Sequence, residues 1–374
     1  MQRKNINVNA AFPMQQIELF ADLCRQNVSL ASGVPDMNFT KFKEASANII
    51  NFFGLPIDEY ECIWNSGATE SAEMIIENLI DAGYKVMIHK LNHTLIPSIY
   101  RRYVDYLDNR HNLGSQIRQC CIICPISPAT GKLYVGKITG EDVLDVTQSI
   151  RHWYCDELKS IRDEVIKSKP RIIFASVYKF GGLRGIGFML RKRIVVGDKV
   201  ADSQTPLIPG STLPNKGLSI VSPRRGGSIP LPGIIHAGEV IKIWKNPVKY
   251  DFMSTWNKLK ILLERLHCKT SFIESCEVDE ENLPFIYGDS DELPIVTPTI
   301  SFKLPVSSMC AIDFIKLMAE KGFDVGYITN CAAGKTSILR LSWADEDSVD
   351  QIDKAIIETI KTMLEEISAK SPVE

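Results

Sequence analysis

Short apolar runs alternate with amphipathic stretches through the first two-thirds of the chain, and this alternation constrains the fold more than any other feature. The runs have the length of buried strands, and the stretches between them have the period of helices that cover a sheet. The expected strands are 61–65, 84–88, 119–124, 152–155, 171–176 and 185–190, and the expected helices are 69–81, 95–107 and 141–149. The alternation predicts an α/β protein built around a mostly parallel sheet.

The last third of the chain has a different pattern. After Pro294 the expected elements are a strand at 295–304, a helix at 308–321, a strand at 337–343 and a helix at 349–367. A Pro- and Gly-rich stretch at 206–233, too long for a simple connector, precedes helical periodicity over 234–266. We therefore expect two domains, a large one over 13–245 and a small α+β domain over 246–374 together with 1–12.

Composition excludes several classes of protein. The 43 basic and 45 acidic residues give a formal charge of −2, and the absence of a strongly basic tract argues against a nucleic-acid-coating protein. No run approaches the roughly 18 uninterrupted apolar residues of a membrane span. The N-terminal residues lack the apolar segment of a secretion signal, so we expect a cytoplasmic protein without membrane or nucleic-acid partners.

Ten cysteines are scattered along the chain, and a chain of this length needs no disulfides to stabilise its core. Cys121 and Cys124 have the CxxC spacing, but they lie inside an apolar run typical of a buried strand. No second pair with zinc-ligand spacing follows them. We therefore favour core packing over a metal or redox site, and we expect no bound metal.

The segment 65–71 is the first candidate binding feature. Its sequence, Asn-Ser-Gly-Ala-Thr-Glu-Ser, is a polar turn between an expected strand and an expected helix. Free backbone N–H groups and the helix dipole at such a start bind phosphate, and the Thr69 hydroxyl adds a donor. Because Ser and Thr are also ordinary helix caps, this turn alone does not identify a site.

The second feature is Lys179, which follows the expected strand 171–176 and precedes Gly181 and Gly182. A lysine at the carboxyl end of a strand is well placed to react with an aldehyde cofactor, and the glycines let the backbone approach a ligand. The alternative is a solvated surface lysine before a turn.

Two acids are candidates for holding a protonated ring nitrogen. Asp145 lies in the expected helix 141–149, which favours a place outside the site. Asp156 ends the expected strand 152–155, where α/β sheets carry their ligand-binding groups, and we prefer it. His93, soon after the strand 84–88, could stack on a planar cofactor or could be a helix-start or core histidine.

Together these patterns resemble one known family. In order, they are Ser-Gly-Ala-Thr-Glu-Ser from Ser66, a histidine soon after the next strand, a strand-ending aspartate, Lys-Phe-Gly-Gly-x-x-Gly-x-Gly from Lys179, and Arg-Arg-Gly-Gly-Ser from Arg224. The chain resembles the cysteine desulfurases of the NifS-like family over nearly its whole length. Its degree of divergence is similar to that of the NifS-like proteins encoded by some large DNA viruses.

The resemblance implies a fold and a cofactor. The fold would be that of the PLP-dependent transferases of fold type I, the aspartate-aminotransferase-like enzymes, with a large mostly parallel sheet domain and a small α+β C-terminal domain. The cofactor would be pyridoxal 5′-phosphate, and the protein would be a homodimer that acts on a small amino acid and passes sulfur to an acceptor protein.

The resemblance also implies residue roles. Lys179 would bond covalently to the cofactor aldehyde, His93 would stack on its ring and Asp156 would hold its pyridine nitrogen. The phosphate would be held by Ala68, Thr69 and Ser176, and Ser228 would reach the phosphate of the neighbouring subunit. Arg340 would grip the substrate carboxylate, a role that suits the planar guanidinium fork.

The chain departs from the family at several positions. Lys159 stands where the family has a glutamine that donates to the cofactor, and Tyr178 replaces the histidine before the lysine. The asparagine expected near Pro128 is absent. Cys331 is the candidate nucleophile, but it precedes Arg340 by only nine residues, so a buried structural thiol stays open as its alternative.

The expected activity is removal of sulfur from L-cysteine to give alanine and a persulfide on the enzyme. Two alternatives stay open. One is another PLP-dependent lyase or aminotransferase that acts on a small amino acid, and the other is a catalytically degenerate NifS-like protein that works as a binding partner.

Overall fold

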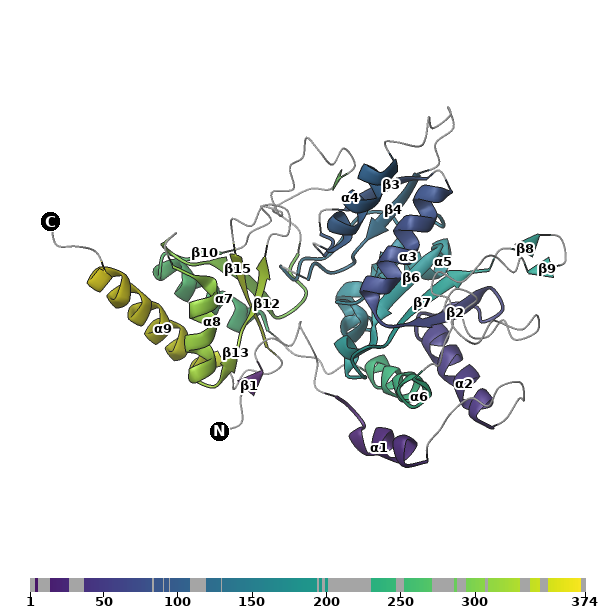
Figure 1. The fold of residues 1–374 in the computed structure, drawn as a ribbon, viewed down its shortest axis with the longest axis horizontal. Helices are drawn as coiled ribbons and strands as arrows, with labels where there is room; N and C mark the ends of the chain where they lie inside the picture. Colours follow the sequence, from purple (N-terminus) through teal and green to yellow (C-terminus); the bar gives the residue numbers. More distant parts are fainter. Residues whose placement is uncertain are drawn as a thin grey trace.

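A seven-stranded sheet forms the centre of the larger part of the molecule (Figure 1). The computed structural model describes residues 4–5, 14–26, 37–82, 84–89, 91–93, 95–107, 119–128, 130–193, 195–196, 199–200, 230–246, 252–270, 286–287, 294–306, 309–329, 337–343 and 349–370. In spatial order the strands are β11 (Ile286–Tyr287), β3 (Lys85–His89), β4 (Gln119–Ile123), β5 (Val143–Asp145), β6 (Ile172–Ser176), β7 (Gly187–Lys192) and β2 (Tyr60–Asn65). Neighbouring strands are parallel from β11 to β6, and β7 is antiparallel to both β6 and β2. The predicted mostly parallel sheet is confirmed.

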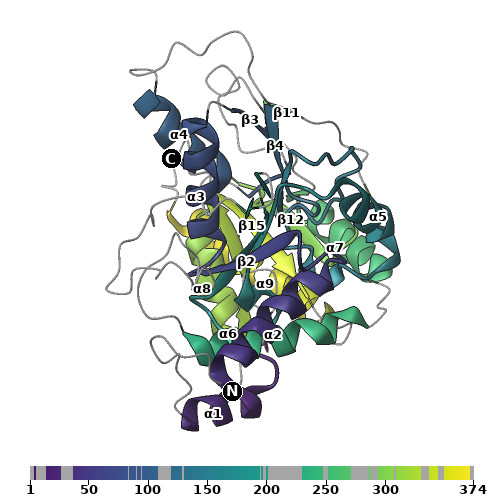
Figure 2. The same cartoon turned by 90° about the vertical axis from the view of Figure 1, so that its right-hand side faces the viewer.

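Side chains of the central strands alternate between two hydrophobic clusters, as the two-residue period of a strand requires. In β6, Ile173 packs into one cluster and Phe174 into the other. The first cluster includes side chains of α2 (Met37–Phe52), α5 (Lys159–Ser168) and α6 (Leu231–Val240), and the second includes those of α3 (Ala68–Asp81) and α4 (Leu95–Leu107). Figure 2 shows α3 and α4 on one side of the sheet and α5 on the other. Helices therefore cover both faces, which is why the strands read as continuous apolar runs.

The smaller part of the molecule contains a four-stranded sheet. Its order is β10 (Lys269–Thr270), β12 (Thr299–Lys303), β15 (Ser337–Ser342) and β14 (Gly326–Thr329), all antiparallel. Ile300 and Leu341, which are paired across β12 and β15, belong to a cluster that includes side chains of α7 (Met253–Arg265), α8 (Ala311–Glu320) and α9 (Val349–Lys370). The opposite face carries Thr299, Ser301, Arg340 and Ser342, which are polar and buried. One face of this sheet thus builds a core, and the other presents polar groups.

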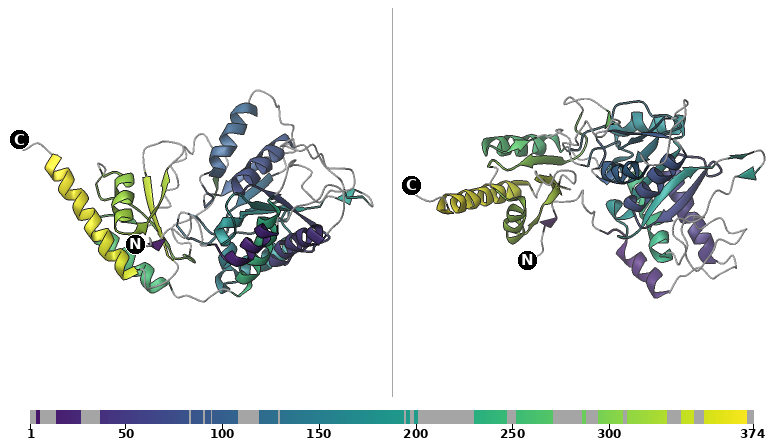
Figure 3. Two further views of the ribbon diagram at one scale, coloured as in Figure 1. Left: turned by 60° about the horizontal axis from the view of Figure 1, so that its bottom comes forward. Right: turned by 45° about the horizontal axis from the view of Figure 1, so that its top comes forward.

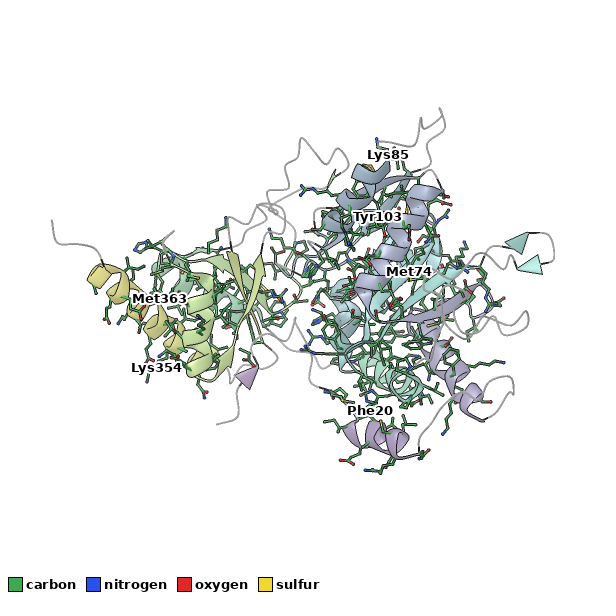
Figure 4. The ribbon with its side chains drawn as sticks, viewed as in Figure 1. Phe20, Met74, Lys85, Tyr103, Lys354 and Met363 are labelled. Atoms are coloured by element: carbon green, nitrogen blue, oxygen red, sulfur yellow. The ribbon has the colours of Figure 1, made fainter. Side chains whose placement is uncertain are left out.

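Each part has its own hydrophobic core. Met74 on α3 and Met363 on α9 belong to different clusters and lie far apart in Figure 4. The N-terminal strand β1 (Lys4–Asn5) pairs with β13 (Phe323–Asp324) in the smaller part, and Figure 3 shows the N-terminus on that side. In contrast, β11 pairs with β3 of the large sheet although it lies in the range expected for the small domain. The domain boundaries at 13–245 and 246–374 stay a prediction.

Two expected elements are wrong, and they are neighbours in the chain. The expected helix 141–149 contains the strand β5, and the expected strand 152–155 is replaced by two short 3₁₀ helices, η1 (Ile150–His152) and η2 (Asp156–Leu158), joined by a turn. The strand β5 bonds to β4 and β6 along its edges and is buried on both faces, which no local pattern specifies.

Other helices and short strands were not expected from the sequence. They are α1 (Ile17–Arg25), α2, α5, the 3₁₀ helix η3 (Val177–Phe180) and the strands β1, β8 (Val195–Val196), β9 (Lys199–Val200), β10, β11, β13 and β14. The 3₁₀ helix η4 (Ile241–Lys245) lies within the expected helical stretch 234–266. Within the described parts of the chain, the helices are all too short or too polar to cross a bilayer.

Candidate functional site

Several polar side chains lie at or just beyond the carboxyl ends of the parallel strands. This is the edge at which open α/β sheets bind their ligands. His93 follows β3, Asp145 ends β5 and Lys179 follows β6. The charges of His93 and Lys179 interact with that of Arg340, which comes from the smaller sheet. Side chains from distant parts of the sequence therefore converge on one site.

A hydrogen bond holds the turn between β2 and α3 against the end of β6. The backbone N–H of Ala68 donates to the Ser176 hydroxyl, with nitrogen and oxygen 2.7 Å apart. The Asn65 side chain accepts from the Gly67 N–H at 3.0 Å and donates to Ser71 at 2.6 Å. Gly187 of β7 lies so close that a Cβ there would be 2.5 Å from the Gly67 Cα. Close approach of two backbones explains the glycine at 187.

The start of α3 has the donors that an anion needs. Ser66 donates from its N–H and its hydroxyl to the Glu70 carboxylate, which closes the turn. Thr69, in the first turn of the helix, is exposed. With the Thr69 and Ser176 hydroxyls at a helix N-terminus, this edge can bind a phosphate group.

Lys179 is 8% exposed and lies on η3, directly after β6. Burial lowers the pKa of its ammonium group well below the usual value, the charges of Arg340 and Arg151 lower it further, and Asp145 opposes them. Burial thus favours the neutral form of this amine, which is its nucleophilic form. The predicted carbonyl-reactive lysine thus has the required environment.

Asp145, and not Asp156, lies next to Lys179. Asp145 is 5% exposed, and its carboxylate accepts from the Thr147 N–H at 3.0 Å. Burial raises its pKa, while hydrogen bonds from Thr147 and the charge of Lys179 lower it. The preference for Asp156 was therefore wrong, because that preference rested on a strand at 152–155 that does not form.

Asp156 and Lys159 lie at the start of α5 on the outside of the molecule. Both are exposed, and both line a shallow surface hollow of about 590 Å³ whose other walls are polar side chains of the same helical segment. Lys159 is therefore also misplaced as a donor to the cofactor. Gln148, which follows Asp145 by three residues and is 7% exposed, lies in the buried segment instead.

Tyr178 lies between two basic side chains. The Lys179 Nζ is 5.5 Å and the Arg184 Cζ is 5.6 Å from the centre of its ring. Burial raises the pKa of the phenol, while Arg184 and Arg340 lower it. The predicted site residue thus lies beside Lys179 with its hydroxyl protonated at neutral pH.

His93 is exposed to solvent and begins the segment that leads into α4. Its Nδ1 accepts from the Leu95 N–H at 3.2 Å, and its carbonyl accepts from the Ile96 N–H at 3.0 Å. Surrounding protein and the charges of Lys179 and Arg340 lower the pKa of its imidazole to about 4. The ring is neutral at pH 7, and the acceptor role of Nδ1 leaves its hydrogen on Nε2.

Arg340 reaches the site from the polar face of the smaller sheet. It is 6% exposed, and its NH1 donates to the Pro128 carbonyl at 2.8 Å. Burial lowers the pKa of the guanidinium to about 10, so the group stays charged at pH 7. A buried cation of this kind favours an anionic ligand.

Two predicted site residues, Ser228 and Cys331, lie outside the described residues. Cys124 is described and buried, and its thiol donates to the Ile126 carbonyl with sulfur and oxygen 2.9 Å apart. Burial and the Asp145 carboxylate raise the pKa of this thiol well above its usual value, so it is not a reactive thiolate.

Sequence reasoning missed two buried groups of the site. Gln148 had a usable signal, the Asp-x-x-Gln spacing from Asp145, which the expected helix 141–149 obscured. Arg151 had no such signal, because an arginine next to a histidine is ordinary in a surface segment. Among the residues that the structure describes, no three or more His, Cys, Asp or Glu side chains are grouped so that they could hold a metal ion.

No family model matches the chain, and no curated protein matches its sequence. Solved structures do match. A NifS-like protein from Rickettsia africae ESF-5 has a TM-score of 0.67 at 14% identity, with 97% of this chain and 100% of that chain covered. The apo cysteine desulfurase from Thermococcus onnurineus NA1 has a TM-score of 0.68 at 15% identity, with 96% and 95% covered. The S-sulfonic acid form of the cysteine desulfurase CsdA from Escherichia coli has a TM-score of 0.62 at 15% identity, with the same coverage.

These structures establish the fold of the chain. The likeness extends over almost the whole length of each protein, so both sheets are included. The α/β fold of the fold type I transferases, which the resemblance implied, is confirmed.

Proposed function

We propose that the chain binds pyridoxal 5′-phosphate and removes sulfur from L-cysteine. The observation that carries the proposal is the buried Lys179, whose amine has a lowered pKa and lies beside Asp145 at the carboxyl edge of the sheet. The fold that the chain shares with cysteine desulfurases supports the same conclusion.

The side chains present fit this cofactor. The Thr69 and Ser176 hydroxyls at the start of α3 suit a phosphate, and the Ala68 backbone N–H holds the Ser176 hydroxyl in place there. The Asp145 carboxylate suits a protonated ring nitrogen, and His93 offers a neutral ring for stacking. Asp145 takes the role that the sequence pattern assigned to Asp156, and Gln148 takes that of Lys159.

When bound, the cofactor would supply an electron sink for charge that develops on the substrate. The chain supplies binding and proton transfer. Arg340 holds the substrate carboxylate with the NH1–Pro128 bond fixing its orientation, and the Lys179 Nζ, whose pKa is lowered by burial, accepts a proton from the substrate carbon. Cys331 is the candidate that receives the sulfur, and it stays a prediction.

The test of this proposal is Lys179→Ala. The wild-type protein mixed with pyridoxal 5′-phosphate is expected to show a visible absorbance band and to retain the cofactor mass after borohydride reduction. The variant is expected to lose both, whereas Lys159→Ala, at an exposed lysine on α5, is the matched control and should keep both. A variant that still traps the cofactor would show that another amine carries it.

Substrate chemistry is tested separately with L-cysteine. Alanine, together with sulfide in the presence of a reductant, supports desulfuration. Pyruvate or a keto acid would indicate a different lyase or an aminotransferase instead. Cofactor binding without any turnover would indicate the degenerate binding protein.

We propose further that the protein works as a cytoplasmic homodimer and that a second protein accepts the sulfur. The resemblance to the NifS-like family implies this dimer, and with it the predicted contact of Ser228 with the neighbouring subunit's phosphate. Sedimentation equilibrium of the loaded protein tests it, because twice the chain mass of 41.9 kDa is expected.

A further inference from the structure

The loop between β3 and α4 carries His93 into the site, and one side chain in it makes unusual contacts. The Asn92 side-chain nitrogen donates to two backbone carbonyls, those of His89 at 2.8 Å and Ile122 at 2.6 Å. The Asn92 backbone N–H also donates to the His89 carbonyl, at 2.9 Å. His89 ends β3, and Ile122 lies near the end of the neighbouring strand β4. Asn92 therefore ties together the carboxyl ends of two parallel strands.

The chemistry of these contacts specifies an amide. Both partners are carbonyl oxygens, which only accept, so the NH₂ group must face them with one hydrogen for each. A carboxylate of the same shape would place an anion against two carbonyl oxygens and would repel both. Asparagine thus fits this position, and aspartate does not.

Through these hydrogen bonds Asn92 restrains the backbone at His93, the next residue in the chain. The loop has a second internal bond, from the Leu91 N–H to the His89 Nδ1 at 3.2 Å, and it then meets α4, where the Leu95 N–H donates to the His93 Nδ1. The position of the imidazole is therefore determined on one side by the strand ends and on the other by the start of α4.

We propose that Asn92 is a positioning residue for His93, holding the β3–α4 loop so that the imidazole keeps its Nδ1 on the Leu95 N–H and its hydrogen on Nε2. The proposal rests on the proposed function only for the reason why this ring matters, which is stacking on the cofactor. The hydrogen bonds of Asn92 carry the positioning itself.

The experiment uses the full chain without cofactor, labelled with ¹⁵N-histidine. The ¹⁵N shifts of a histidine distinguish a single neutral tautomer from a mixture, and His93→Gln assigns the signal. At pH 7 the wild type is expected to give His93 as the pure Nε2–H tautomer. Asn92→Ala is expected to lose that pure pattern and to give averaged shifts, and Asn92→Asp is expected to lose it to a greater extent despite its matching shape.

The matched control is Asn48→Ala. The Asn48 amide on α2 also contacts a side chain distant in sequence, Glu239, with nitrogen and oxygen 3.5 Å apart, but it lies outside the loop. It should leave the His93 signals unchanged. A purely structural role of Asn92 would lower the unfolding midpoint without moving the His93 shifts, and that result would overturn the proposal. A wild-type His93 with its hydrogen on Nδ1, or charged at pH 7, would overturn it as well.

Failure of the proposed function has a different signature. A wild-type chain that never develops the visible band with pyridoxal 5′-phosphate contradicts cofactor binding, but it leaves the tautomer measurement valid. In a chain that does bind the cofactor, Asn92→Ala is expected to shift the band, and an unchanged band together with unchanged His93 shifts would count against the positioning role.

Discussion

Lys179 and Arg340 are two buried basic side chains that respond to burial in different ways. Burial lowers the pKa of Lys179 well below its usual value, which favours loss of its proton. Arg340 retains its charge at pH 7 even with a pKa of about 10. One residue is therefore suited to react and to carry protons, and the other to bind an anion.

Replacing Arg340 with alanine is expected to weaken amino-acid binding without loss of cofactor. Loss of a buried, charge-assisted contact to a carboxylate costs about 2 to 4 kcal/mol, so the KM should rise by roughly 30- to 1,000-fold. Steady-state kinetics with L-cysteine and titration of the visible band measure the two effects. Arg102→Ala, at an exposed ion pair with Glu73, is the control and should change neither. An equal loss of cofactor affinity in Arg340→Ala would place Arg340 on the cofactor instead.

The two acids are separated by paired substitutions. Asp145→Asn is expected to reduce turnover by about 10²-fold or more, because it removes the carboxylate that would keep the ring nitrogen protonated. Asp156→Asn, at the surface, should change stability by less than about 0.5 kcal/mol and leave turnover unchanged. Turnover and the spectrum of the loaded protein provide the measurement. The reverse order of effects would contradict the assignment of Asp145.

At the scale of elements, the short segment from β5 to η2 supplies several of the buried polar side chains of the site. β5 has three residues, and it ends on Asp145 because its neighbours β4 and β6 supply hydrogen bonds on both edges. The following 3₁₀ helix η1 contains the buried Arg151 and the half-buried His152. This compact segment carries buried ionisable groups, so its stability depends on pH.

His152 is the group in η1 that makes this dependence measurable. Burial, together with the charge of Arg151, lowers the pKa of its imidazole to about 3, whereas the unfolded chain takes up the proton near 6.5. The folded state is therefore favoured at neutral pH and loses stability as the pH falls from about 6.5 toward 3. This residue should contribute a loss of about 2 kcal/mol between pH 7 and pH 5.

Urea unfolding of wild type and His152→Gln at both pH values measures this contribution. The variant is expected to lose about 2 kcal/mol less than wild type over the same interval. His267→Gln, at an exposed histidine after α7, is the control and should follow the wild type. Parallel pH dependence in wild type and His152→Gln would show that His152 takes up its proton without unfolding.

At the scale of the whole molecule, two backbone hydrogen bonds join the segment after β4 to the segment before β12 near the site, and we call this pair of bonds the tie. The Val296 N–H donates to the Gly131 carbonyl at 2.9 Å, and the Leu133 N–H donates to the Pro294 carbonyl at 2.8 Å. The same loop carries Pro128, whose carbonyl accepts from Arg340. Arg340, the proposed substrate-binding arginine, is thus held in register with the large sheet by the segment that connects them.

Gly131→Val tests this tie. Gly131 has φ +71°, and a Cβ there would lie 2.5 Å from the Thr297 Oγ1, so the variant strains the backbone and pushes the two segments apart. The KM for L-cysteine is expected to rise by at least about tenfold because Arg340 moves, while the visible cofactor band remains.

Gly322→Val supplies the matched control. Gly322 also has a positive φ, +90°, but nothing lies within 4 Å of its Cβ position, and it is in the turn between α8 and β13. Both variants should lose about 1 to 3 kcal/mol of stability, and only Gly131→Val should raise the KM. An equal rise in both would mean that strain alone, and not the tie, affects substrate binding.

The sequence alone predicted a secondary-structure element correctly where its periodic pattern is long or where a recognisable motif follows its last residue. The helix at 95–107 forms with the expected bounds, and the strand before Lys179 forms within one residue of its expected start, because their periodic patterns extend over a full element. The Lys-Phe-Gly-Gly pattern also identified Lys179 correctly as a strand-end lysine. These features are determined by residues that are adjacent in the sequence, which is why the sequence alone predicts them.

The acid beside Lys179 was decided only by the tertiary structure. Residues 141–149 can form a helix by their own pattern, and the three residues of β5 become a strand because β4 and β6 bond to both edges and helices cover both faces. The same is true of Arg340, which reaches the site through the polar face of a sheet built from a distant segment. Pairing between segments far apart in sequence leaves no local periodicity. The sequence alone therefore determined the fold class and the position of Lys179 after a strand, and packing determined which side chains lie around it.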